Sequence, residues 1–113
     1  MVSNFIHICS LVVSSCIAKA YKFDITLRSH EDWDFLVAML HGGCRFTYIP
    51  MIGGVAHWDH NHSHRGQGSR NQGEWPLDFL QIYRRWPAQT ADQRERRRQM
   101  LSGFGLEVPS CRL

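Results

Sequence analysis

An alternation of apolar and polar residues over 21–29 limits the folds open to this chain more than any other feature. Every second residue from Tyr21 to Leu27 is apolar, and the residues between them are polar or charged. Successive side chains of a β-strand point to opposite faces, so this pattern predicts a half-buried strand. A second run, 44–52, is rich in β-branched and aromatic residues and predicts another strand, with Pro50 confining its end to an edge or a bulge.

The stretch between these two segments has the pattern of an amphipathic helix over roughly 30–41. Its apolar residues recur at the three- and four-residue spacing of one helical face: Trp33, Leu36, Val37 and Leu40. Ser29 stands where an N-cap is expected, and Asp32 follows in the capping-box position. Gly42 and Gly43 then provide a stop, because glycine readily adopts the left-handed conformation that ends helices.

Further helices are predicted over 75–86 and 91–101. The second of these has a capping-box pattern at Thr90 and Gln93. The 113 residues suffice for one domain. The order of elements therefore predicts an α+β fold, a small single domain with a short antiparallel sheet, one helix near 30–41 and a C-terminal helical region.

Composition divides the chain into four parts: 1–20, an α+β core over 21–64, a Gly-rich loop at 65–74 and a basic helical region over 75–113. Residues 1–20 have two interpretations, a signal peptide or the first core strand. Their apolar run is too short to span a bilayer, and residues 18–20 have the small-x-small form of a cleavage site. Because no Lys or Arg precedes the run, an intracellular location is slightly favoured over secretion, and no transmembrane segment is expected.

Positive charge is concentrated in the C-terminal part. Residues 1–64 carry four basic and five acidic side chains, whereas residues 65–113 carry nine and five, and all nine basic residues are arginine. Guanidinium groups match phosphate geometry, which favours nucleic acid as a partner, and nearby aromatic rings that could stack on unpaired bases favour RNA. The predicted nucleic-acid-binding residues are Arg84, Arg85, Arg94, Arg96, Arg97, Arg98 and Trp86. The alternative is a solvated helix face with the aromatic residues in the core.

The densest cluster of chemically active side chains is the segment 57–64, which contains four histidines and Asp59. In an extended backbone His60, His62 and His64 share one face and could bind a labile divalent metal such as zinc. No cysteine pair or helical zinc motif completes a ligand set. The alternatives are therefore a histidine-rich metal-binding protein and an exposed polar loop without a cofactor.

No hydrolase, nucleotide-binding or metalloprotease motif occurs, so we expect a protein that is not an enzyme. The leading hypothesis is a small basic accessory protein, of the kind that viruses and mobile elements encode, that binds RNA through its C-terminal arginines. An alternative is a secreted protein–protein interaction module with a Cys44–Cys111 disulfide, the pair that would remain after cleavage behind residue 20. A further alternative is the product of a recently arisen reading frame without a defined function. The sequence leaves the oligomeric state open.

Overall fold

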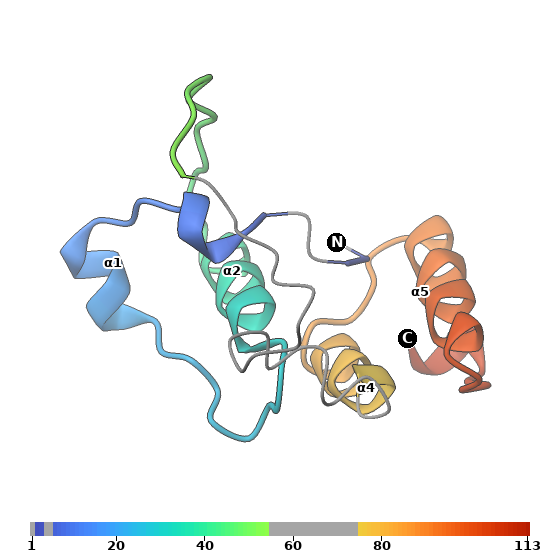
Figure 1. The fold of residues 1–113 in the computed structure, drawn as a ribbon. Helices are drawn as coiled ribbons and strands as arrows, with labels where there is room; N and C mark the ends of the chain where they lie inside the picture. The colour runs from blue at the N-terminus through green and yellow to red at the C-terminus, as the bar shows by residue number, and fades with distance from the viewer. Residues whose placement is uncertain (1, 4–5, 55–74) are drawn as a thin grey trace, which may run out of the picture.

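The chain is built from helices in a computed structural model that describes residues 2–3, 6–54 and 75–113 (Figure 1). In order, the elements are η1 (Ile8–Ser10), α1 (Ser15–Ala20), α2 (Glu31–His41), α4 (Trp75–Arg85), α5 (Ala91–Gly103) and η3 (Ser110–Arg112). None of the described residues belongs to a β-strand. The predicted α+β fold with a short antiparallel sheet is therefore wrong.

The helix predicted over 30–41 is present as α2. Three acidic side chains occupy its first turn, where they interact favourably with the positive end of the helix dipole. Gly43 follows the last turn with φ of 82°, the left-handed conformation that favours glycine. The predicted Ser29 cap is wrong, because the N-cap residue is His30 and the Ser29 hydroxyl donates instead to Asp78 of α4.

Helix α2 is the centre of the core, and its buried side chains contribute to two apolar clusters. The cluster shared with α4 and α5 consists of Leu27, Trp33, Val37, Phe79, Ile82, Tyr83, Leu101 and Leu113. The cluster on the other side of α2 consists of Phe35, Leu36 and Met39. Four residues of the N-terminal segment pack against this second cluster: Ile6, Leu11, Val13 and Ile17. A helix that is covered on several sides has no wide polar face, which explains the apolar run 35–39. Leu40, which the sequence places on the apolar face, is 46% exposed.

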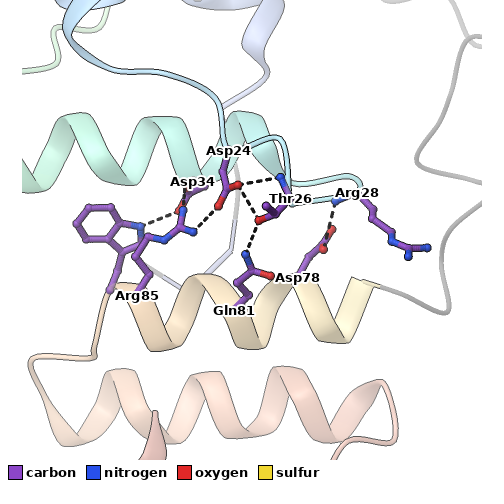
Figure 2. Close-up of polar contacts among 8 residues, drawn as sticks. Asp24, Thr26, Arg28, Asp34, Asp78, Gln81 and Arg85 are labelled. Atoms are coloured by element: carbon purple, nitrogen blue, oxygen red, sulfur yellow. Dashed lines mark hydrogen bonds and ion pairs between the residues drawn. The ribbon is translucent and has the colours of Figure 1, made fainter.

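Helices α4 and α5 form an antiparallel hairpin that lies beside α2, with α4 in the middle (Figure 2). Thr90 caps α5 as its sequence predicts, since its hydroxyl accepts a hydrogen bond from the Gln93 amide at 3.2 Å. At the opposite end of the hairpin, Trp75 of α4 meets Phe104 just after α5, with ring centroids 6.4 Å apart. The connection 86–90 therefore places the end of α4 next to the start of α5.

The alternation over 21–29 does not produce a strand, because its apolar residues do not share a face. Leu27 is buried, Ile25 is 95% exposed, and Phe23 stacks on Phe35. Asp24 turns the chain, since its carboxylate accepts hydrogen bonds from the amide and the hydroxyl of Thr26. A local turn thus replaces the straight backbone that the alternation predicts.

The other two predicted strands are also absent. Residues 1–20 contain η1 and α1 where they are described, and residues 44–52 have neither helix nor strand bonding. The segment 44–54 leaves the end of α2 as an arm that projects from the helices (Figure 1). A strand requires a second strand to pair with, and the described residues offer none beside this arm.

Candidate nucleic-acid interface

The predicted arginine residues lie at one end of the α4–α5 hairpin, but they have different surroundings. Arg85, at the end of α4, points toward α2 and pairs with two carboxylates (Figure 2). It donates to Asp34 Oδ2 at 2.6 Å and to Asp24 in the turn before α2. The Thr26 hydrogen bonds and the Arg85 guanidinium lower the pKa of Asp24 to about 2. Arg85 therefore joins α4 to α2 and to the 21–29 segment.

Trp86, like Arg85, donates a hydrogen bond to Asp34, and its ring is not free to stack on a base. Its indole Nε1 donates to Asp34 Oδ1 at 2.8 Å, so both oxygens of this buried carboxylate have a partner. One face of its ring stacks on the His41 imidazole at 4.8 Å. Trp75 and Tyr83 are the other aromatic residues that the sequence suggests for stacking on unpaired bases. Tyr83 belongs to the core cluster, and Trp75 packs against it.

Arg97 is buried between α4 and α5, with 4% of its surface exposed. It donates to the backbone carbonyls of Trp86 at 2.7 Å and Leu113 at 3.0 Å, and its guanidinium lies 4.5 Å above the Tyr83 ring. Burial lowers the pKa of Arg97 and raises that of Tyr83. These contacts fix the connection between the helices and the C-terminal residue, so Arg97 has a structural role.

Arg96 and Arg98 lie on the surface of α5 and pair with carboxylates of their own helix. Arg96 meets Asp92 at 2.9 Å, and both side chains are about two-thirds exposed. Arg98 donates twice to Glu95, which lowers the pKa of that carboxyl to about 2. Surface pairs of this kind leave guanidinium N–H groups directed to solvent, where another anion can reach them.

Arg84 and Arg94 have no carboxylate partner among the described residues. Arg84 is exposed on α4 and Arg94 is half-buried in the first turns of α5. Residues 75–113 carry seven basic and four acidic side chains. Of the seven cations, Arg97 is buried, and Arg85, which is 37% exposed, is paired with two carboxylates. Four of the predicted arginines therefore remain as outward-facing cations of the hairpin: Arg84, Arg94, Arg96 and Arg98. Arg112, which is exposed in η3 and was not among the predicted residues, is a fifth surface cation of this region.

A polar cluster at Asp78 was missed in the sequence. Asp78 is buried in the first turn of α4, and its Oδ2 accepts from the amide and the hydroxyl of Ser29, both at 3.0 Å. Its Oδ1 accepts from the Arg28 amide at 3.4 Å (Figure 2). The only sequence signal is an aspartate near a helix start, which usually indicates a favourable dipole interaction at the surface. Here it anchors the chain that enters α2.

The cluster contains a serine, a histidine and an aspartate, but it lacks the geometry of a catalytic triad. A triad histidine uses one ring nitrogen for the nucleophile and the other for the aspartate. In this cluster His30 Nδ1 faces both the Ser29 hydroxyl, at 2.9 Å, and Asp78, at 3.4 Å. The His30 ring meets Phe79 edge-on at 4.7 Å. These contacts hold α2 against α4 and do not form a proton relay.

The predicted metal ligands His60, His62 and His64 lie outside the described residues. In the ranges that are described, no group of three or more His, Cys, Asp or Glu side chains could hold a metal ion. The four cysteines all fall within these ranges and are free thiols, so Cys44 and Cys111 form no disulfide here. Cys44 packs against the second core cluster, whereas Cys111 is exposed in η3.

Comparison of the whole chain with protein-family models, curated proteins and solved structures found no match. Inferences about function therefore depend on this chain's own residues. Among the helices described, none has the length and apolar character needed to cross a membrane.

Proposed function

We propose that this chain is a small, non-enzymatic accessory protein that binds nucleic acid through phosphate contacts from the α4–α5 hairpin. The observation that carries the proposal is the group of outward-facing guanidiniums Arg84, Arg94, Arg96 and Arg98, two of which have no carboxylate partner in the described residues. Arg85, Arg97 and Trp86 are left out of the interface, because their polar atoms stabilise the fold.

The surface ion pairs of α5 do not prevent phosphate binding. The Asp92–Arg96 pair is solvent-exposed and of the i,i+4 type, which contributes only about 0.3–0.5 kcal/mol. A phosphate can therefore replace the carboxylate at small cost. Arginine also keeps its charge at any physiological pH, so the interface does not depend on a proton.

This arrangement supports binding to the backbone of a nucleic acid and gives little basis for reading its sequence. Four phosphate contacts correspond to a slope of log Kobs against log salt of about −3 for single strands and about −3.5 for duplex DNA. With Trp86 and Tyr83 engaged inside the protein, base stacking adds little to the affinity. We keep RNA as the first ligand to test and DNA of equal length as its comparison.

The test is a salt titration of binding by fluorescence anisotropy with a labelled single-stranded RNA. We expect Arg84→Gln/Arg94→Gln to weaken binding and to make the salt slope shallower by about 1.5. The matched control is Lys22→Gln/Arg45→Gln, which removes the same charge from two exposed residues outside the hairpin. The control should leave the slope unchanged. No binding of the wild type to RNA or DNA at low salt, or equal effects of the two double variants, would refute the proposal.

A further inference from the structure

On the surface of α5, the carboxylate of Glu95 is held by a fork of hydrogen-bond donors. Arg98 donates to it through two nitrogens, from Nε to Oε2 at 2.9 Å and from Nη2 to Oε1 at 2.7 Å. The side-chain amide of Gln99 donates to the same Oε1 at 3.0 Å. Three N–H groups therefore converge on one anion, and the paired bonds from a guanidinium have the geometry with which arginine also binds phosphate.

The spacing of these residues along α5 produces the fork. Side chains three and four positions apart are neighbours on a helix surface, so Glu95 reaches both Arg98 and Gln99. Arg94 precedes Glu95 and lies one turn, about 6 Å along the helix axis, before Arg98. Arg94 has no carboxylate partner among the described residues. Glu95 therefore stands between a cation that it pairs with and a cation that no described carboxylate neutralises.

The other ion pair on the surface of α5 is the weaker of the two. Arg96 Nε meets Asp92 Oδ2 at 2.9 Å, and these side chains are 65% and 68% exposed. The Arg98 and Glu95 side chains are less exposed, at 39% and 45%, and Gln99 adds a third donor. Solvent weakens an exposed ion pair, whereas bidentate geometry strengthens it. Glu95 therefore holds its arginine more firmly than Asp92 does.

We propose that the fork formed by Arg98 and Gln99 is a phosphate subsite, and that a phosphate group of the ligand displaces Glu95 from it on binding. This assignment rests on the proposed function, because it describes one of the phosphate contacts of the α4–α5 hairpin. The three N–H groups that Glu95 leaves become donors to phosphate oxygens, so the fork loses no hydrogen bond. Glu95 thus acts as a competitor for the ligand within the protein itself.

Competition by Glu95 makes the subsite selective for anions with several linked charges. A small anion with one charge gains at Arg98 only the attraction that Glu95 loses. A chain of phosphates also reaches Arg94, and that contact displaces no described carboxylate. Once one phosphate is bound, the linkage raises the effective concentration of the next at the neighbouring cation. A polyanion therefore displaces Glu95, whereas a single carboxylate does not.

The first test follows the Arg98 Nε–H signal by nuclear magnetic resonance while inorganic tripolyphosphate is added to the full chain. The signal should shift in the wild type, and Glu95→Gln should lower the apparent Kd about three- to fivefold, because the competing carboxylate is removed. The matched control is Asp92→Asn, which removes the same charge one turn away and should lower the Kd less than about twofold. Acetate at the same ionic strength should leave the signal unchanged.

The second test is a double-mutant cycle of RNA affinity measured by fluorescence anisotropy. Glu95→Gln should strengthen binding when Arg98 is present and change it less than about twofold in an Arg98→Gln background, because the competition acts through Arg98. The slope of log Kobs against log salt should be the same in the wild type and in Glu95→Gln, since Arg98 contacts a phosphate in both. A slope steeper by about 0.7 in Glu95→Gln would mean that Arg98 engages only without Glu95, and it would overturn the proposal.

The two probes separate this subsite from the proposed function. A wild type that binds neither RNA nor DNA refutes the proposed function, whereas the tripolyphosphate titration still decides what the fork binds. The subsite is overturned if tripolyphosphate leaves the Arg98 signal of the wild type unchanged. It is also overturned if Asp92→Asn and Glu95→Gln have equal effects, because the gain would then come from net charge alone.

Discussion

Replacement of Arg85 by glutamine tests the central polar contact of the fold. Arg85→Gln removes the cation that lies between Asp34 and Asp24, and it leaves two carboxylates without a counter-charge. The Asp34 side chain is only 4% exposed, so water cannot take over this role. In this variant the Trp86 indole still donates its single N–H to Asp34, but this neutral donor does not replace the lost positive charge.

The magnitude follows from the burial of the two partners. Removal of one member of a fully buried ion pair costs about 3–5 kcal/mol, whereas exposed pairs contribute about 0–1 kcal/mol. The Arg85 side chain is 37% exposed, which places this pair between the two limits. We expect the free energy of unfolding to fall by about 2 kcal/mol, with a decrease of Tm by about 6–10 °C for a domain of this size.

The assay is urea unfolding followed by far-UV circular dichroism at pH 7, with Arg84→Gln as the control. Arg84 is the adjacent residue and is exposed, so its replacement should change stability by less than about 0.5 kcal/mol. Asp34→Asn should cost less than Arg85→Gln, because the asparagine oxygen still accepts from Trp86 and Arg85 still has Asp24. The reasoning is refuted if the two arginine variants are equally stable or if Asp34→Asn is the more damaging change.

Three other predictions concern Arg97, Gly42 and Asp24. Arg97→Met should lower the free energy of unfolding by about 2–4 kcal/mol in a urea titration, because it leaves the part-buried Trp86 carbonyl without its guanidinium donor, and an unchanged midpoint would contradict the structural role. Gly42→Ala should reduce Tm, since a Cβ there overlaps the Tyr21 hydroxyl, and Tyr21→Ala should remove that sensitivity. Because the pKa of Asp24 is lowered from 3.8 to about 2, its contribution to stability, about 1–2 kcal/mol, is present above pH 4 and is lost as the pH falls toward 2; Asp24→Asn should flatten this part of the stability–pH curve.

Helices α2, α4 and α5 were predictable because their signals are local, whereas α1 lies in a segment for which the sequence predicted a signal peptide or a strand. Thr90 and Gln93 are three residues apart, and their hydrogen bond forms as the sequence predicts. Helix α2 likewise has acidic residues at its start and glycines at its end. The strand prediction for 21–29 failed because alternation indicates only that a strand is possible. Whether one forms depends on a partner strand, and in this chain the Asp24–Thr26 turn replaces it.

The candidate site was only partly predictable for the same reason. Arginine composition pointed to the α4–α5 hairpin, but it could not separate Arg84 from Arg85, since the difference comes from Asp34 and Asp24, which are 51 and 61 residues away in the chain. Asp78 was overlooked because its partners at 28–30 are equally distant. In the sequence, the one indication that Arg97 is buried is that α5 has few apolar residues to pack against α4, so a polar residue must occupy part of that contact.

The three consecutive arginines 96–98 have a consequence for how this sequence tolerates change. Position 96 faces solvent and position 98 is half-buried beside a glutamate, so many polar residues should be accepted at both. Position 97 must reach two carbonyls and cover the Tyr83 ring from inside the fold, a combination that few other side chains can match. In a saturation library scored for folded protein, position 97 should tolerate few substitutions, whereas positions 96 and 98 should tolerate many.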